Sequence, residues 1–599
     1  MACSKQNNRQ SFKALCLAVI HGLTFVSLAN AAAWTSFQSR PDIRAPVMNI
    51  TLKNDTFITP GYIFIAPFLT ELPGPYIYDN DGNLIWSGAD GSATELFHDL
   101  KVCPYEGSDH LCYFQGNQIE GYARGRHVVL NEHYKEVTAI QSGNGLTLSD
   151  LHELKFINET TALIPIYQPR RYNLEAYNIS ANKGWVMDGV FQEIDTKTGK
   201  VLFEWRSLDH VALSESYTPI RLDTVVGDGL SNATAWDYFH LNSVDKNSDG
   251  DYLVSARHTS CIYKVSGKDG SVKWRLGGRN SSIEMKDYNF SAQHDARFHE
   301  ENDTVTVISL FDNGSNNYIN TSTTSAGMIV SVDHEANISS LVKRYEAPDE
   351  GLLSTSQGNL QILPNKNAVI GWGSNPSISE HTEDGNPVFF ATLNNPKTMN
   401  YRAYKFNWTG EPSDDPALRT YGASPGSATT FWMSWNGATR VDHWNLYGTN
   451  SSSDQFTLLS RVGKQGFQST YTSPNYHPRA YAEAASSDGT SLGNSTANPS
   501  KQALDEETTA RLQTTATKPQ SERQVHNLTL LRRQTRQIMF YLQFPCHLDP
   551  MRMHLIQVTT IVPQNTLLAI RRRDPTPHHR PFTSVKELEF VKVPTIEKM

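Results

Sequence analysis

His240-Leu-Asn-Ser-Val244 is the stretch that decides the fold, because close variants of it recur along the chain. The variants are His98-Asp-Leu-Lys-Val102, His152-Glu-Leu-Lys-Phe156 and His294-Asp-Ala-Arg-Phe298. A fifth run, Gly358-Asn-Leu-Gln-Ile362, keeps the pattern without the histidine. Successive runs begin 54, 88, 54 and 64 residues apart. Repeats of about 50 residues that each hold four short strands are typical of the blades of a β-propeller.

Each run is followed by further β-patterned segments that are separated by turn residues. After His240, for example, Ile262 to Val265 and Val272 to Trp274 flank an Asp-Gly turn. The 88-residue interval indicates one blade with an insertion near 207–235, rich in Ser, Asp and Gly. Residues 61–88 supply three more strands, and Tyr401–Phe406 would return to complete a sixth blade and leave no exposed edge.

We therefore predict an all-β protein with a six-bladed β-propeller over residues 35–410. The alternative, a pair of β-sandwiches, would not explain the repeated four-strand order. Residues 416–500 contain strand patterns between turn signals and predict a small fibronectin/Ig-like β-sandwich. Residues 501–599 are rich in Thr, Gln, Glu, Lys and Arg, and this composition predicts a disordered C-terminal tail.

The N-terminus has the pattern of a secretory signal peptide over residues 1–31. Lys5, Arg9 and Lys13 precede a mostly apolar stretch, and Ala29-Asn30-Ala31 offers a small-residue cleavage site. The alternative is an uncleaved, buried segment. No later stretch reaches about 18 apolar residues, so we predict no membrane span and a secreted, extracellular protein.

Charge and sequons are consistent with an extracellular location. The chain has 53 basic and 61 acidic residues, a net charge of −8, which disfavours nucleic acid as a partner. Asn-x-Ser/Thr sequons occur repeatedly and predict glycosylated surface loops. The predicted glycosylation sites are Asn49, Asn54, Asn158, Asn178, Asn232, Asn280, Asn289, Asn302, Asn313, Asn320, Asn337, Asn407 and Asn450.

Cysteine spacing predicts one local disulfide and no metal centre. Cys103 and Cys112 lie on either side of a Gly-Ser-Asp turn, so we expect a disulfide between neighbouring strands. The chain has neither a CxxC pair nor an HExxH motif. We therefore expect no metal and no cofactor.

The repeated histidines are the candidate functional residues. The first strand of each blade lines the central channel of a propeller, so His98, His152, His240 and His294 would gather at one mouth. The acidic and amide residues that would join them are Asp150, Glu153, Asn242 and Asp295. Arg257-His258 ends the strand that follows the His240 run.

These residue types suit the transfer of an anionic tetrahedral group such as sulfate. Arginine binds its oxygens in bidentate fashion, a neutral imidazole can attack it, and a second imidazole can move the acceptor proton. Alternatively, the histidines bond to the backbone of neighbouring blades and only hold the ring together.

Several longer stretches resemble the arylsulfotransferase-like propeller proteins, specifically their secreted fungal branch. The clearest are Gly74 to Trp86, Phe191 to His210, and Trp236 through Ser255-Ala-Arg-His258 to Gly278. Further matches are Gln293-His294-Asp295, Phe311-Asp-Asn-Gly314, Gly371-Trp-Gly373 and Met433 to Ala438. The resemblance spans roughly residues 35 to 490.

The resemblance implies a six-bladed propeller that moves a sulfuryl group between phenols through a sulfated histidine, without a nucleotide donor. It implies catalytic roles for His240, His294, Arg257 and His258. The position of the first strands at the channel separately predicts substrate contacts for His152, Asn242, Asp295, His98 and Asp150. Two positions depart from the family pattern. Gly371-Trp-Gly-Ser-Asn-Pro-Ser377 holds no histidine, the nearest being His381, and Asn316-Asn-Tyr318 stands where an arginine is expected.

Three functional hypotheses follow. The first is a sulfuryl-transfer enzyme whose partner is a small phenolic or sulfated molecule. The second is a non-enzymatic extracellular module that binds a cell-wall glycan or protein. The third interprets Asp195 to Trp205 as a quinone-cofactor propeller motif, and it is disfavoured because such Gly-to-Trp turns mainly secure strand pairs.

Overall fold

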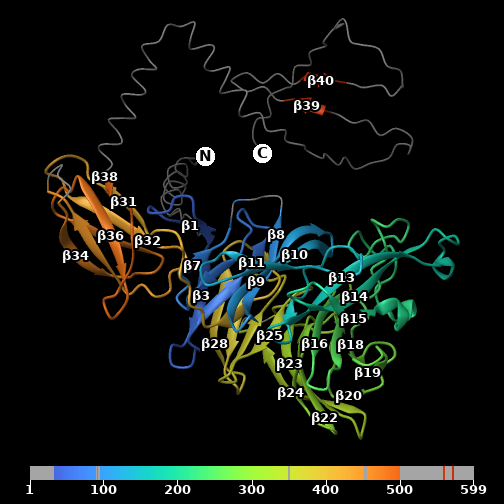
Figure 1. The fold of residues 1–599 in the computed structure, drawn as a ribbon. Helices are drawn as coiled ribbons and strands as arrows, with labels where there is room; N and C mark the ends of the chain where they lie inside the picture. The colour runs from blue at the N-terminus through green and yellow to red at the C-terminus, as the bar shows by residue number, and fades with distance from the viewer. Residues whose placement is uncertain are drawn as a thin grey trace, which may run out of the picture. The chain divides into compact units, whose positions relative to one another are not determined.

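A computed structural model gives the architecture of the chain (Figure 1). It describes residues 33–89, 91, 95–348, 351–450 and 455–499, together with the backbone of 557–559 and 569–571. The predicted signal peptide, and the predicted tail apart from those two short segments, lie outside the described residues. Helical structure in the described part is confined to the 3₁₀ turns Glu175–Tyr177, Ser207–Asp209 and Leu213–Glu215, so the all-β prediction is confirmed.

Three of the sheets have four strands in chain order. The first contains β8 (Leu96–Tyr105), β9 (Ser108–Ile119), β10 (Tyr122–Leu130) and β11 (Glu136–Ile140). The second contains β12 (Lys155–Phe156), β13 (Thr161–Arg171), β14 (Trp185–Asp195) and β15 (Val201–Arg206). The third contains β16 (Leu241–Lys246), β17 (Tyr252–Ala256), β18 (Cys261–Val265) and β19 (Val272–Gly277).

Two further sheets add a fifth strand to this pattern. In one, β21 (His294–Glu301), β22 (Val305–Asp312), β23 (Ala326–Asp333) and β24 (Ile338–Glu346) are joined by β20 (Glu284–Lys286). In the other, β25 (Asn359–Ile362), β26 (Ala368–Gly371), β27 (Ser377–His381) and β28 (Pro387–Leu393) pair with β3 (Met48–Lys53).

The sixth sheet joins the two ends of this region. The strands β4 (Tyr62–Ile65), β6 (Tyr76–Tyr78) and β7 (Leu84–Ser87) come from the N-terminal part, and β30 (Tyr404–Phe406) pairs with β4. The pairing predicted for Tyr401–Phe406 is confirmed. The nearby two-stranded pairs are β1 (Trp34–Ser36) with β2 (Arg44–Pro46) and β5 (Pro67–Phe68) with β29 (Met399–Asn400).

Residues 417–499 form two more sheets around their own core. One contains β31 (Ala417–Tyr421), β32 (Thr429–Ser434) and β35 (Gln468–Ser473). The other contains β34 (Thr457–Gly463), β33 (His443–Gly448), β36 (Arg479–Ala485), β37 (Ser491–Asn494) and β38 (Asn498–Pro499). Phe431, Trp444 and Leu446 are fully or almost fully buried between them. The short strands β39 (Gln557–Thr559) and β40 (Ala569–Arg571) pair with each other.

The predicted disulfide is present. Cys103 on β8 and Cys112 on β9 are bonded, with 6.0 Å between their Cα atoms. Among the described residues, no helix has the length and apolar composition needed to cross a membrane.

Candidate functional site

A cavity of about 190 Å³ lies where several inner strands begin. It brings together four repeated histidines whose positions in the sequence span almost 200 residues. Its lining includes His98, His152, His240, Arg257, His258 and His294, and each of these is at most 9% exposed. The sequence prediction that these side chains share one cavity therefore agrees with the structure.

Local backbone bends turn the histidines toward the cavity. His240 has φ 57° just before β16, and Asp99 (φ 60°) and Asp295 (φ 57°) follow His98 and His294 directly. The strand register shifts at each of these places. A residue with positive φ at a β-bulge re-aims the neighbouring side chains. In the second sheet, β12 begins only at Lys155, and His152 lies in the preceding turn.

Two of the histidines are each held by a carboxylate. Asp237 accepts a hydrogen bond from the His240 backbone N–H at 3.0 Å and lies 2.5 Å from the ring Nδ1. Asp150 binds the backbone N–H and Nδ1 of His152 in the same way. When Nδ1–H donates to a carboxylate, Nε2 carries the lone pair. No hydrogen bond to Nε2 of either ring comes from the described residues, and both rings line the cavity.

The two carboxylate-bound rings are neighbours. Their centroids lie 5.0 Å apart with an interplanar angle of 84°. Tyr167 contacts both rings, at 5.3 Å from His152 and 5.6 Å from His240, and its hydroxyl donates to the Leu241 carbonyl at 2.7 Å. Tyr401 packs edge-on against His152 at 5.4 Å. The aromatic side chains therefore fix the orientation of both imidazoles.

Arg257, which is held by His258, forms the cationic side of the cavity. Arg257 Nη1 donates to His258 Nε2 at 2.9 Å, and Nη2 donates to the Thr355 carbonyl at 2.9 Å. His258 Nδ1 donates to the Asp237 carbonyl at 2.6 Å. These bonds occupy both nitrogens of His258 and hold the guanidinium at the cavity wall, where its remaining N–H groups can bind an anion.

The other two histidines differ in their partners. His294 Nδ1 lies 2.6 Å from Asn313 Oδ1, and its Nε2 accepts from the Gln357 N–H at 3.2 Å. His98 is 1% exposed, lies 4.7 Å from the ring of Phe68, and neither of its nitrogens has a hydrogen-bond partner among the described residues. The imidazole of His294 therefore has both nitrogens occupied by the fold.

Burial keeps most of these imidazoles neutral. Burial, with a smaller contribution from the nearby His152 and His240, respectively, lowers the pKa of His98 and of His258 to about 3. Burial, together with His152 and Arg257, lowers the pKa of His240 well below its usual value. The pKa of His294 falls in the same way through burial and Arg257. Neutral imidazoles are nucleophiles, so the electrostatics suit attack on an anion held by Arg257.

Three predicted substrate contacts lie away from this cavity. Asp150 is behind His152, where its second oxygen accepts the Ala123 N–H at 2.7 Å. Asn242 donates to the Gln293 carbonyl at 2.7 Å. Asp295 lines a second cavity of about 300 Å³, and its carboxylate bonds to Arg297. Asp150 therefore contacts a cavity histidine without lining the cavity, whereas Asn242 and Asp295 lie at strand bulges and bond elsewhere.

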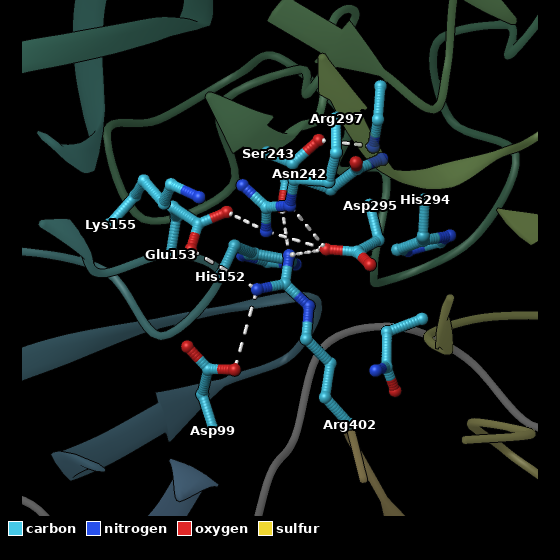
Figure 2. Close-up of polar contacts among 12 residues, drawn as sticks. Asp99, His152, Glu153, Lys155, Asn242, Ser243, His294, Asp295, Arg297 and Arg402 are labelled. Carbon is cyan, nitrogen blue, oxygen red and sulfur yellow. Dashed lines mark hydrogen bonds and ion pairs between the residues drawn. The ribbon is translucent and has the colours of Figure 1, made fainter. Parts of the chain in front are cut away.

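A buried ion cluster holds the acidic residues of the inner strands (Figure 2). Arg402 is fully buried, with Nη1 3.4 Å from Asp99 and 3.3 Å from Glu153, and Nη2 3.6 Å from Asp295. Arg297 bonds to Glu153 at 2.5 Å. Burial alone would raise the pKa of Glu153, but the surrounding Arg297, Arg402 and Lys101 lower it below its usual range. These carboxylates therefore have a structural role, because they form ion pairs with buried arginines.

The structure also shows residues that the sequence analysis did not assign. Asp237 precedes His240 by three positions, and an Asp at this spacing was the available signal for the pair. No comparable sequence pattern indicated that Tyr167 and Tyr401 would contact the histidines. Tyr318, in the segment where an arginine was expected, lines the cavity, and its hydroxyl donates to Asp223. His381 lies on β27 and bonds to Ser379 at 2.9 Å, outside the cavity lining.

One group of side chains has the composition of a metal site. Donor atoms of Asp237, His240 and His258 lie within 4.8 Å of one another. The Asp237 carboxylate is bonded to His240, however, and His258 Nε2 accepts from the Arg257 guanidinium. A cation would have to displace these bonds and lie beside a positive charge. We interpret the group as a hydrogen-bonded network.

Asn313 corrects one of the predicted glycosylation sites. Its side chain is fully buried, and its amide donates to the carbonyls of Ser354 at 2.8 Å and Gln357 at 2.9 Å. A glycan there is incompatible with this fold. The side chains of the other predicted acceptors are exposed: Asn49, Asn54, Asn158, Asn178, Asn232, Asn280, Asn289, Asn302, Asn320, Asn337, Asn407 and Asn450.

Asp312, next to Asn313, makes folding stability depend on pH. Burial raises its pKa to about 6 from 3.8, although the Ser291 N–H and Arg344 favour the charged form. The folded state therefore binds the proton more tightly, and this stabilisation is complete below the unfolded pKa and is lost as the pH rises through about 6. We expect Asp312→Asn to gain up to about 3 kcal/mol relative to the wild type between pH 4 and pH 7. Urea unfolding at several pH values measures this difference, and a pH-independent difference would contradict it.

Comparison with known proteins supplies a family for this region. The family model described as Arylsulfotransferase (ASST) matches residues 102–394. No curated protein matches the sequence. The chain is similar to a solved protein of unknown function from Bacteroides caccae, at 14% identity and a TM-score of 0.34, covering 58% of this chain and 99% of that one. A catalytically inactive virginiamycin B lyase from Staphylococcus aureus is 13% identical with a TM-score of 0.22, covering 60% and 88%. TM-scores as low as these support no inference about function.

Proposed function

Because residues 102–394 place this chain in the arylsulfotransferase (ASST) family, we propose that it transfers a sulfuryl group between phenolic compounds in the histidine cavity. The ligand is a small phenolic or sulfated molecule, and the reaction needs neither a nucleotide donor nor another cofactor. We also propose that the chain belongs to the secreted fungal branch of this family.

The Asp237–His240 pair beside Arg257 is the observation that carries the proposal. Nδ1 of His240 is bound to the carboxylate at 2.5 Å, so its Nε2 is the free nitrogen at the cavity wall. The ring centroid of His240 lies 4.5 Å from that of His258, which accepts a hydrogen bond from Arg257. A sulfonate held by the guanidinium would therefore lie beside an unprotonated imidazole, the arrangement that nucleophilic transfer needs.

The departures from the family pattern favour a second candidate. The chain has no histidine in Gly371–Ser377, and His381 lies outside the cavity lining. Glu120 and Asp223 also line the cavity and oppose the charge of Arg257 toward an anion. These observations support a non-enzymatic extracellular module that binds a cell-wall glycan or protein.

The sheet order supports a closed ring. We infer that the six sheets between β3 and β30 are the blades of one β-propeller. The inner strand β16 contacts both β13 and β21, and β25 contacts β21 and β22, so successive sheets pack side by side. The pairing of β30 with β4 joins the two ends of the region. We further infer that residues 416–500 form an Ig-like sandwich, because two sheets enclose one core there.

The extracellular location is part of the same proposal. We infer secretion from the signal-peptide pattern of residues 1–31 and glycosylation from the exposed sequons. Among the described residues, the disulfide between Cys103 and Cys112 is compatible with an oxidising compartment.

A transfer assay tests the function. The purified wild-type protein should release nitrophenol from p-nitrophenyl sulfate and form phenyl sulfate when phenol is added. His381→Gln is the matched control, because this histidine lies outside the cavity lining and its replacement should leave kcat/KM unchanged. If the folded protein releases no nitrophenol, the enzymatic proposal is wrong. Glycan-array binding that survives in His240→Ala/His294→Ala would then favour the second candidate.

A further inference from the structure

A second cavity, of about 300 Å³, is lined by basic residues from the repeated runs. Three of the four histidine runs carry a basic residue three positions after the histidine, namely Lys101, Lys155 and Arg297. The structure brings these three side chains together at the second cavity, and the proposed function uses none of them. We propose that this cavity binds a small organic anion, in which an oxyanion group is attached to an apolar body.

The second cavity is separate from the histidine cavity. No described residue lines both cavities. Tyr401 lines the histidine cavity and Tyr404 lines the second one, whereas Arg402, between them in the chain, lines neither and is fully buried. The ion cluster around Arg402 includes Glu153 and Asp295, which line the second cavity (Figure 2). A ligand of the second cavity would therefore contact none of the side chains proposed to bind the sulfuryl group.

The carboxylates that line the second cavity are already bound within the protein. Glu153 accepts from Arg402 through Oε1 at 3.3 Å and from Arg297 through Oε2. Asp295 accepts from Arg297 through Oδ1 at 2.9 Å and from the Leu360 N–H through Oδ2 at 3.1 Å. Every oxygen of the two carboxylates thus accepts a hydrogen bond. Their negative charges are balanced by buried guanidinium groups and do not set the charge of a ligand.

Lys155 supplies positive charge that the fold leaves available. Its side chain is 40% exposed, and its ion pair with Asp245 Oδ1 spans 3.6 Å, which is too long for a hydrogen bond. Asp245 itself accepts the backbone N–H groups of Lys246 at 3.0 Å and Phe298 at 3.1 Å. The ammonium of Lys155 therefore keeps its N–H donors for a ligand. Lys101 beside it donates to two carboxylates and has a third N–H left. Spare donors that carry positive charge select an anionic acceptor group.

The remaining walls of the second cavity are largely apolar. Val102 on β8, Phe156 on β12, Ile362 on β25 and Phe406 on β30 come from four different sheets. Val102, Ile362 and Phe406 are half-buried, so part of their apolar surface is open to solvent. A ligand body that covers this surface removes it from water, which favours binding. His299 adds an imidazole N–H at the polar side. The cavity therefore suits an aromatic or aliphatic carboxylate, sulfonate or sulfate ester better than an inorganic ion.

Calorimetric titration with 2-naphthalenesulfonate tests this site. The titrated protein carries Arg257→Ala, which weakens anion binding in the histidine cavity and leaves the second cavity intact. We expect this protein to bind the probe at a single site. Adding Lys155→Met should weaken binding about 10–100-fold, because a charged hydrogen-bond donor is lost, whereas Lys155→Arg should largely retain it. Lys366→Met is the matched control, because this exposed lysine lines neither cavity.

Related probes define the class of ligand. 2-Naphthoate should bind about as tightly as the sulfonate, because it joins the same body to another oxyanion. 2-Naphthol lacks the charge, and inorganic sulfate lacks the apolar body, so each should bind at least about 10-fold more weakly. If 2-naphthol binds as tightly as the sulfonate, the site does not select anions. If inorganic sulfate binds as tightly, the apolar wall contributes nothing. Either result would overturn the proposal.

Lysine acetylation provides a test that needs no variant. In the wild type, 2-naphthalenesulfonate at about 10 times its Kd should slow acetylation of Lys155 by acetic anhydride about 10-fold, because only unliganded protein reacts. Acetylation of Lys366 should stay unchanged, and peptide mass spectrometry measures both. Equal acetylation of Lys155 with and without the probe, or undiminished binding by folded Lys155→Met, would overturn the proposal. Absence of nitrophenol release would refute the proposed function alone, because the second site does not depend on it.

Discussion

Arg257→Ala should lower kcat/KM for transfer from aryl sulfates about 100–1,000-fold. Arg257 is the one guanidinium that lines the described cavity, and the Thr355 carbonyl and His258 fix its orientation. A fixed cation loses little entropy on binding a sulfonate, and the low exposure of the site strengthens its field. Steady-state kinetics with p-nitrophenyl sulfate and phenol measure the loss.

Two further variants make this result specific. Arg257→Lys keeps the charge but loses the planar fork, so we expect an activity between those of the wild type and Arg257→Ala. Arg279→Ala is the matched control, because Arg279 is exposed and stacks on Tyr217 without lining the cavity. Equal activity of Arg257→Ala and wild type would show that the cavity does not bind the sulfonate.

Arg402→Met should destabilise the fold by about 3–5 kcal/mol. The Arg402 side chain is fully buried, and it lies among Asp99, Glu153 and Asp295 while donating to the Asn242 carbonyl at 2.9 Å. Removing the guanidinium leaves these carboxylates buried with less compensating charge, which is the costly way to break a buried ion pair. Urea unfolding monitored by tryptophan fluorescence measures the change.

An exposed ion pair provides the comparison. Lys366 and Glu383 are 2.9 Å apart, with side chains 68% and 61% exposed, and Lys366→Met should change stability by less than about 1 kcal/mol. Adding Glu153→Gln to Arg402→Met should recover part of the loss, because one of the stranded charges is removed. If the Arg402→Met and Lys366→Met variants are equally stable, the ion cluster does not hold the inner strands together.

Many of the strands could be predicted from the sequence alone. The runs that begin at His98, His240 and His294 coincide with parts of β8, β16 and β21, because alternating apolar residues between turn signals favour short buried strands. The Cys103–Cys112 bond was predictable for the same local reason, since a tight turn between paired strands brings the two cysteines together. Asn313 was mispredicted because a sequon does not show whether its own side chain is buried.

The sequence by itself determined which residue types open each repeat, and hence that His98, His152, His240 and His294 would meet. Which of them can react was decided only by the tertiary structure. A bulge of one residue sends His294 to Asn313 and Asp295 to Arg297, while Asp237 and Asp150 anchor His240 and His152. Hydrogen-bond geometry depends on ångström distances between side chains from different sheets, and no pattern along the chain records those distances.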